Sequence, residues 1–207
     1  MHKERKSHWE QLYRDTSPQA VSWYQSAPTL SCALIRASGS DRQAPLIDVG
    51  GGASTLVDQL LADGYGDVSV LDISAEALTH ARHRLGARAG GVRWIEADVT
   101  QFRPPQVYRL WHDRAVFHFL TAAEDRAGYR AALEGGLAPG GQLIIGTFAP
   151  GGPERCSGLP IVQYDAARMQ AELGEHFALL ETRVELHRTP AGTDQSFNFF
   201  RFVRRVA

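Results

Sequence analysis

Residues 46–55 read Leu-Ile-Asp-Val-Gly-Gly-Gly-Ala-Ser-Thr, and this stretch decides the fold. The apolar run 45–49 predicts a buried strand, and the apolar spacing of residues 56–61 predicts a helix directly after it. Between the two elements lies the glycine turn, Gly50 to Gly52. The lack of side chains there lets a ligand approach the backbone closely. The stretch therefore predicts a strand–turn–helix unit with a ligand at its turn.

Short apolar strands alternate with helical patterns on both sides of this unit, from about residue 44 to residue 148. This alternation predicts βαβ units and a parallel sheet. Two long runs near the C-terminus predict an antiparallel pair at the edge of that sheet. We expect an α/β, Rossmann-like, doubly wound sheet of seven strands whose seventh strand is reversed. The expected strands are 45–49, 68–71, 92–95, 107–111, 142–148, 177–187 and 195–204.

The chain has 207 residues, a length that favours a single domain. We expect four segments within it: a short helical N-terminal cap (1–43), a cofactor-binding core (44–148), a substrate-side loop (149–164), and a C-terminal helix with the antiparallel strand pair (165–207). The loop is rich in glycine and proline, and loops of such length are uncommon unless they are functional or disordered.

Composition excludes several classes of protein. Lys and Arg number 22 against 23 Asp and Glu, so the net charge of -1 gives no long-range attraction for nucleic acid or an anionic membrane. No apolar run approaches the ~20 residues that span a bilayer, and the N-terminus does not read as a secretory signal. Two cysteines are too few for a disulfide framework. We expect a cytoplasmic protein that binds neither nucleic acid nor membrane; the sequence does not predict its oligomeric state.

Acidic residues follow the expected strands at the edge where the glycine turn lies. Asp72 ends the second strand, where a carboxylate accepts hydrogen bonds from both hydroxyls of a ribose. Ile73 is expected to lie flat against an adenine ring. After the third strand, Asp98 is placed to accept from the adenine amine, and Val99 to form the other apolar wall. Because ligands of open α/β sheets bind at the carboxyl ends of strands, these residues predict a nucleoside site.

Residues 48–54, Asp-Val-Gly-Gly-Gly-Ala-Ser, resemble the first motif of class I S-adenosylmethionine-dependent methyltransferases, with Ser54 in place of the third glycine of that pattern. Residues 70–73 look like the ribose motif of that family, residues 97–99 like its adenine motif, and residues 137–141 like the turn before its fifth strand. The resemblance implies S-adenosylmethionine as cofactor and S-adenosylhomocysteine as product. The implied cofactor-binding residues are Asp48, Gly50, Gly52, Asp72, Ile73, Asp98 and Val99.

Residues 9–13, Trp-Glu-Gln-Leu-Tyr, and 22–24, Ser-Trp-Tyr, are similar to the start of the elongation-factor lysine methyltransferase type and its bacterial relatives. The similarity implies that Tyr13 and Trp23 close over the cofactor, where aromatic faces attract the cationic sulfonium. The alternative role of these side chains is to pack the N-terminal helix. Residues 111–114 depart from the acidic segment of that group. The methyl acceptor therefore stays open between a small molecule and a protein side chain, through nitrogen or sulfur.

Methyl transfer from a sulfonium is an in-line displacement, so a base is needed only when the acceptor arrives protonated. Asp113, at the end of the fourth strand, is a candidate to hold the cofactor's ammonium group, unless Arg114 pairs with it. His112 and His118 are candidate bases, and Cys156 is a candidate catalytic thiol. The spacing of these three residues matches no metal signature, so no metal site is predicted.

Two other functions share parts of this pattern. A NAD(P)-dependent Rossmann oxidoreductase has the same turn and the same acid after the second strand. However, Thr55 stands where the dinucleotide fingerprint requires glycine, and the C-terminal strand pair also disfavours it. A non-catalytic S-adenosylmethionine-binding protein would keep the whole pocket. We predict an S-adenosylmethionine-dependent methyltransferase.

Overall fold

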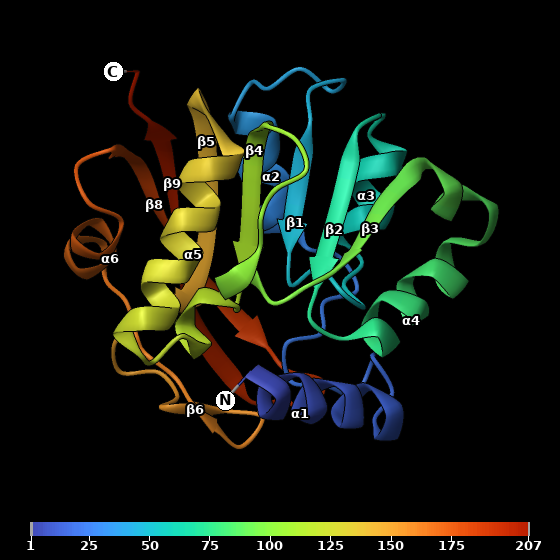
Figure 1. Cartoon of the computed structure of the whole chain (residues 1–207). Helices are drawn as coiled ribbons and strands as arrows, with labels where there is room; N and C mark the ends of the chain where they lie inside the picture. The colour runs from blue at the N-terminus through green and yellow to red at the C-terminus, as the bar shows by residue number, and fades with distance from the viewer. Residues whose placement is uncertain (1, 207) are drawn as a thin grey trace.

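The computed structural model describes residues 2–206. Its centre is a seven-stranded sheet in the order β3-β2-β1-β4-β5-β9-β8 (Figure 1). The first five strands are parallel, and β9 runs antiparallel to both of its neighbours. The expected sheet with a reversed seventh strand is therefore confirmed. The strands are β1 (Leu46–Val49), β2 (Val68–Asp72), β3 (Val92–Glu96), β4 (Tyr108–Arg114), β5 (Leu137–Phe148), β8 (Phe177–Arg188) and β9 (Asp194–Arg204).

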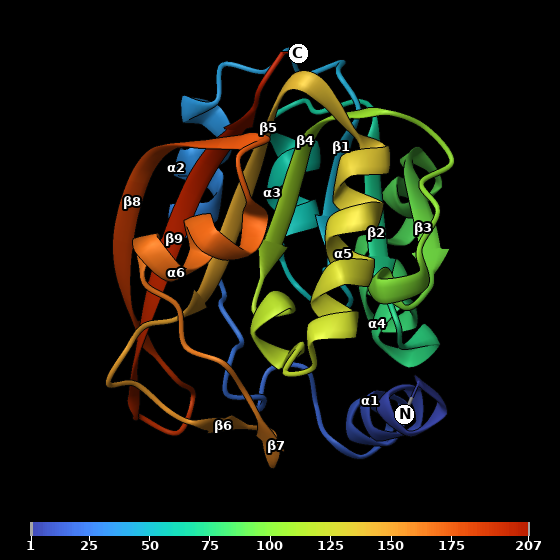
Figure 2. The ribbon, with the colours of Figure 1, turned by 60° about the vertical axis from the view of Figure 1, so that its left-hand side comes forward.

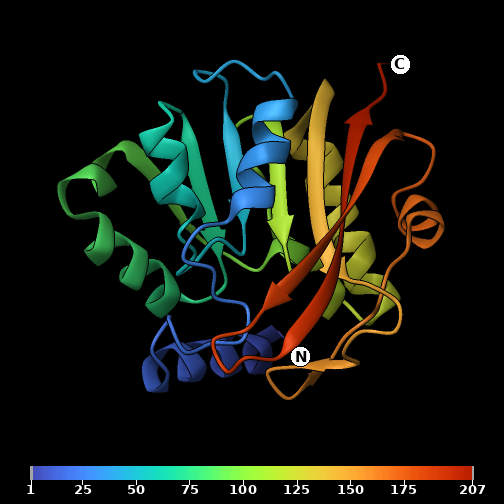
Figure 3. The ribbon, with the colours of Figure 1, turned by 180° about the vertical axis from the view of Figure 1, so that it is seen from behind.

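Helices cover both faces of the sheet. One face packs against α2, α3 and α4 (Figure 3), and the opposite face packs against α5 and α6 (Figure 2). The α-helices are α1 (His2–Asp15), α2 (Thr29–Ala37), α3 (Leu56–Ala62), α4 (Ala75–Leu85), α5 (Ala123–Gly136) and α6 (Ala166–Leu173), with 3-10 turns η1 (Gly86–Gly91), η2 (Val99–Gln101) and η3 (Phe117–Phe119).

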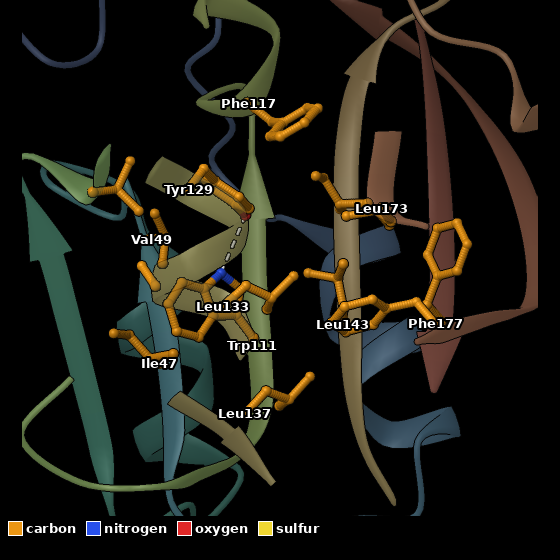
Figure 4. Packing of buried hydrophobic residues seen from close by; sticks show 14 of the residues in the cluster. Ile47, Val49, Trp111, Phe117, Tyr129, Leu133, Leu137, Leu143, Leu173 and Phe177 are labelled. Atoms are coloured by element: carbon orange, nitrogen blue, oxygen red, sulfur yellow. Dashed lines mark hydrogen bonds between the residues drawn. The ribbon is translucent and has the colours of Figure 1, made fainter. Parts of the chain in front are cut away.

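The core on the α5 side is built from large side chains of the sheet and the helix (Figure 4). Trp111 of β4 lies under α5 and donates a hydrogen bond from Nε1 to the Tyr129 hydroxyl at 3.1 Å. Leu133, Leu143 and Phe177 are fully buried around this pair. Burial of each such side chain contributes about 1.5–3 kcal/mol, so this cluster holds the strands rigidly where they reach the site.

The strands β4 and β5 extend furthest beyond the sequence-based expectation, and β5 begins at Leu137 instead of residue 142. β4 continues to Arg114, because its register with β5 is kept up to the pairing of Arg114 with Gly146. His112 and Asp113 therefore lie within the strand and not after it. The expected loop 149–164 contains a short antiparallel hairpin, β6 (Arg155–Cys156) and β7 (Leu159–Pro160).

The N-terminal helix α1 lies across the carboxyl ends of the parallel strands, next to the β6–β7 hairpin (Figures 1 and 2). Its Glu10 side chain accepts hydrogen bonds from the backbone N–H groups of Ala75 at 2.9 Å and Glu76 at 3.2 Å. These N–H groups belong to the first turn of α4, where backbone donors have no partner within the helix and a carboxylate is favoured. Within residues 2–206, no helix combines the length and the apolar character that a membrane crossing requires.

Candidate cofactor and methyl-transfer site

A cavity opens at the carboxyl ends of β1, β2, β3 and β4, beneath α1. It contains about 740 Å³ of empty space when its open mouth is included. It therefore lies where open α/β sheets bind their ligands. Its walls are formed by Arg5, Trp9, Tyr13, Trp23, Val49, Gly50, Leu71, Asp72, Ile73, Ala97, Asp98, Val99, Arg114, Ala115, Val116, Phe119, Leu120 and Cys156.

A second cavity adjoins the first, and Asp48 lies in its wall together with Gly50 and Gly51. Four residues line both cavities: Tyr13, Trp23, Gly50 and Arg114. Of the sequence-predicted cofactor residues, the first cavity brings together Tyr13, Trp23, Gly50, Asp72, Ile73, Asp98 and Val99. Gly52 and Asp113 are buried beside the cavities instead of standing in their walls.

The glycine turn passes between the carboxylates of two strands. A Cβ atom on Gly51 would lie 2.4 Å from Asp48 Oδ2, and one on Gly52 would lie 2.4 Å from Asp72 Oδ2. Gly50 has a φ of +69°, which L residues with side chains rarely adopt. Only glycine fits these three positions, and the turn keeps both carboxylates close to its backbone.

Asp72 is 7% exposed, and one of its carboxylate oxygens accepts a hydrogen bond from the Ser74 N–H at 2.9 Å. Burial raises the pKa of Asp72 to about 7, and the nearby Asp48 carboxylate adds to the increase. A buried carboxylate with remaining acceptor capacity suits a vicinal diol, because hydroxyl donors replace the water that burial removes. The ribose role predicted for Asp72 is compatible with this geometry.

We expect the affinity for S-adenosylhomocysteine to rise with pH through about 7. In the free protein the Asp72 carboxyl, whose pKa burial raises to about 7, is protonated below that pH and then offers fewer acceptor sites to the ribose. Going from about pH 8 to about pH 6 should weaken binding by roughly tenfold, as measured by titration calorimetry. Asp72→Asn does not titrate and should show a flat profile. An unchanged slope in that variant would assign the pH dependence to another group.

Asp98 already has protein partners. Its Oδ1 accepts from the N–H and the hydroxyl of Thr100 at 2.9 and 2.8 Å, and its Oδ2 accepts from Arg5 at 3.2 Å. Arg5 also bonds Asp125 at 2.5 Å, so a residue of α1 ties the loop after β3 to α5. The adenine contact predicted for Asp98 remains a prediction. Arg5 was not singled out from the sequence, because only folding brings it within reach of residues far along the chain.

Aromatic side chains of the N-terminal segment form the boundary between the two cavities. The Trp23 indole N–H donates to the Tyr13 hydroxyl at 3.2 Å, and Trp9 packs edge-to-face on Trp23 and on Phe119 with ring centroids 5.7 and 5.1 Å apart. Tyr13 is buried, which raises the pKa of its phenol. Tyr13 and Trp23 therefore also pack α1 against the body, and their predicted contact with the sulfonium stays a prediction.

Arg114 lines both cavities and does not pair with Asp113. Its guanidinium donates to the Trp23 carbonyl at 3.0 Å and to Glu185 of β8 at 3.3 Å, and it stacks over the Phe197 ring at 4.6 Å. Burial lowers the pKa of Arg114, while the Glu185 carboxylate opposes that shift. This residue fixes the loop that carries Trp23, a role that the sequence alone does not indicate.

Asp113 is fully buried, on the sheet face opposite to Arg114. It accepts a hydrogen bond from the Val116 N–H at 2.9 Å, and burial raises its pKa to about 6. Val116 in turn lies against Gly50, since a Cβ added to Gly50 would be 2.0 Å from Val116 Cγ2. The geometry thus gives Asp113 a part in shaping the loop that packs on the glycine turn.

The three catalytic candidates are all buried, and none is placed as an accessible base. His118 Nδ1 accepts from the Phe148 N–H at 3.3 Å, and burial lowers the pKa of His118 to about 3. His112 belongs to the wall of the second cavity, but it is 2% exposed and both of its ring nitrogens have partners. Cys156 does lie in the wall of the first cavity, but burial raises the pKa of its thiol to about 11.

We expect both cysteines to react slowly with iodoacetamide at neutral pH, because the thiolate is the reacting species. Cys32 and Cys156 are each 6% exposed, and burial raises the pKa of both thiols. Mass spectrometry of the folded protein should show full labelling only after denaturation. Rapid labelling of folded protein at Cys156 would instead indicate an activated thiol.

Comparison with known proteins agrees with the geometry. A family model described as a methyltransferase domain matches residues 46–141. The eEF1A lysine and N-terminal methyltransferase of Danio rerio is 29% identical over 147 residues, which are 69% of this chain and 21% of that protein. This chain therefore spans about a fifth of the length of that relative.

Solved structures show the same fold over nearly the whole chain. One structure comes from work on the conversion of a disulfide bond into a thioacetal group during echinomycin biosynthesis. It has a TM-score of 0.79 at 20% identity, and the match covers 97% of this chain and 93% of that chain. Another is the N-methyltransferase NodS from Bradyrhizobium japonicum WM9 in complex with S-adenosylhomocysteine, with a TM-score of 0.72 at 19% identity, covering 94% of this chain and 97% of its own.

The sheet order, the glycine turn and the cavity at the strand ends are the features of an α/β enzyme that binds a nucleoside cofactor. Together with the match of residues 46–141 to a methyltransferase domain, they support the predicted S-adenosylmethionine-dependent methyltransferase. The NodS structure holds S-adenosylhomocysteine, which is consistent with the predicted cofactor. These findings favour this class over the NAD(P)-dependent alternative.

Proposed function

We propose that this protein transfers a methyl group from S-adenosylmethionine to a nitrogen or sulfur atom of a small molecule. The observation that carries the proposal is the cavity at the ends of β1 to β4, where the glycine turn passes between two carboxylates and α1 forms a roof. The residues present fit the cofactor. A Cβ atom on Gly51 or Gly52 would collide with the Asp48 or Asp72 carboxylate, and Asp48 Oδ2 is buried without a hydrogen-bond partner among the described residues.

The chain contributes positioning and exclusion of water. When bound, S-adenosylmethionine supplies an electrophilic methyl group on a sulfonium. Tyr13 and Trp23, which line both cavities, present aromatic faces where the two cavities meet, and such faces stabilise a nearby cation. Asp72 holds the ribose hydroxyls through its carboxylate. Orientation and desolvation of this kind supply most of the rate of an in-line displacement.

The acceptor arrives with its lone pair free. Of the three catalytic candidates, Cys156 lines the first cavity, and its pKa of about 11 keeps the thiol protonated at neutral pH. A protonated thiol does not accept the proton of an alkylammonium. The site therefore favours acceptors that are deprotonated in water, such as a weakly basic nitrogen or an acidic thiol.

The roof over the cavity favours a small acceptor over a folded protein surface. His8 of α1 lies 3.2 Å from the Ser157 hydroxyl of the β6–β7 hairpin, and Trp9 contacts Phe119 below it. A protein side chain would have to enter between these elements, whereas a small molecule needs only a brief opening. A protein nitrogen acceptor is the second candidate, because the Danio rerio relative is named as a lysine and N-terminal methyltransferase.

Methyl-labelled S-adenosylmethionine incubated with the protein and a cell extract tests the proposal. We expect the label in the small-molecule fraction, and none with Asp72→Ala, which removes the ribose acceptor. Label bound to protein would select the second candidate. If the folded protein bound S-adenosylhomocysteine without transferring label to any fraction, it would be a non-catalytic binding protein.

A further inference from the structure

A buried chain of hydrogen bonds joins the N-terminal segment to the first strand of the sheet. Ser31 of α2 lies 2.9 Å from His112 Nε2, and His112 Nδ1 lies 2.7 Å from Asp48 Oδ1. The three residues are 1%, 2% and 2% exposed. Asp48 and His112 are register partners on β1 and β4, so the sheet itself sets this pair side by side.

The direction of the bonds follows from the chemistry of the groups. An ionised carboxylate only accepts, so His112 donates from Nδ1 to Asp48. In a neutral ring Nε2 then accepts, and the Ser31 hydroxyl donates to it. Hydrolase triads have the same order of bonds, but Ser31 is 1% exposed even though it belongs to the wall of the second cavity. Ser31 therefore supports the ring and does not present a nucleophile.

The other oxygen of the Asp48 carboxylate is left for a ligand. Oδ2 is buried and has no hydrogen-bond partner among residues 2–206, although an uncompensated buried carboxylate is costly. Asp48 lines the second cavity, which joins the first at Tyr13 and Trp23. With the adenosine part of the cofactor in the first cavity, its amino-acid end reaches the second, where an ammonium group would pair with Oδ2.

We propose that His112 and Ser31 are positioning residues that orient the Asp48 carboxylate toward the ammonium group of the cofactor. This inference rests on the proposed function, because it takes S-adenosylmethionine as the ligand. His112 thus acts through Asp48 and takes no proton from the acceptor. The arrangement also makes cofactor affinity depend on α2, since Ser31 lies in that helix.

Two ligands separate this role from a general structural one. S-adenosylhomocysteine carries the amino-acid end, and 5′-methylthioadenosine has the same adenosine and sulfur without it. Titration calorimetry of the whole chain with both ligands should show that His112→Leu weakens S-adenosylhomocysteine binding by about tenfold to a hundredfold, the range expected for lost hydrogen bonds to a charged group. Binding of 5′-methylthioadenosine should change by less than about twofold.

Three further variants complete the test. His112→Asn keeps a donor close to the Nδ1 position and should restore most of the affinity for S-adenosylhomocysteine. Ser31→Ala removes a single hydroxyl, leaves the fold least disturbed, and should weaken the same ligand by about threefold to tenfold. His176→Leu is the matched control, because the His176 side chain is 75% exposed and lies near Glu134, away from both cavities.

Equal losses for both ligands in folded His112→Leu and Ser31→Ala would overturn the inference, and so would unchanged affinities. Wild-type protein that binds the two ligands equally would also overturn it, while leaving the proposed function standing. Wild-type protein that binds neither ligand would instead refute the proposed function.

Discussion

Gly52→Ala is expected to abolish measurable binding of S-adenosylhomocysteine while the protein still folds. The new methyl group would lie 2.4 Å from Asp72 Oδ2 and 2.8 Å from the Ala77 Cβ atom. Because Ala77 is buried in α4, the Asp72 carboxylate is the group that must move. Overpacking and the loss of charge-assisted bonds to the ribose together weaken binding by about a hundredfold or more. Titration calorimetry measures the effect.

Gly135→Ala is the matched control for this substitution. Gly135 lies in α5, and nothing lies within 4 Å of a Cβ atom placed there. Alanine favours a helix over glycine by about 0.8–1 kcal/mol, so the control should melt at the same or a higher temperature. Its affinity for the ligand should not change. Wild-type affinity in folded Gly52→Ala would show that the turn is not part of the cofactor site.

Asp72→Ala is expected to cause the second largest loss, again by about a hundredfold, because two hydrogen bonds to a charged acceptor are lost at once. The melting temperature at pH 8 should stay the same or rise. Burial raises the pKa of this carboxyl to about 7, which shows that its charged form is disfavoured in the folded protein. Calorimetry with S-adenosylhomocysteine and a thermal melt measure the two quantities on the same sample.

Asp67→Ala tests whether the effect belongs to one end of β2. Asp67 precedes this strand at the opposite end and bonds Gln106 at 3.2 Å, far from the cavity walls. We expect no change in ligand affinity for this variant. Similar losses at both positions would mean that affinity follows the stability of the strand and not the ribose contact.

Glu10 and Arg5 show how the N-terminal helix becomes part of the site. Glu10 accepts from the first N–H groups of α4, directly after Asp72 and Ile73, while Arg5 reaches Asp98 after β3. One helix therefore bonds the loops at the ribose and adenine ends of the predicted site. In the sequence neither side chain has a binding role of its own, although Glu10 lies within the segment 9–13 that resembles a methyltransferase N-terminus.

The acids and glycines of the predicted site can be recognised in the sequence, because the carboxyl ends of neighbouring parallel strands lie at the same edge of a sheet. Once β1, β2 and β3 are recognised, Asp72, Asp98 and the turn at Gly50 must lie close together, whatever the rest of the chain does. The reversed last strand was predictable for a similar reason, since a short connection between two long strands permits only an antiparallel pair.

The catalytic candidates could not be judged in this way. His112, His118 and Cys156 are residue types that act as bases or nucleophiles in solution, but burial lowers the pKa of His118 to about 3 and raises that of Cys156 to about 11. Burial depends on which distant segments cover a residue. His118 stacks on Phe148 at 4.8 Å between centroids, and no local pattern encodes that contact.

By itself, the sequence determined the α/β sheet, the position of the glycine turn and the acids at the strand ends, because hydrophobic periodicity and turn chemistry act over short distances along the chain. Tertiary structure alone decided that Arg114 pairs with Glu185, 71 residues away, and that Ser31 reaches His112, 81 residues away. Such contacts depend on how helices and strands pack in space. The charge and orientation of each side chain in the site were therefore set only on folding.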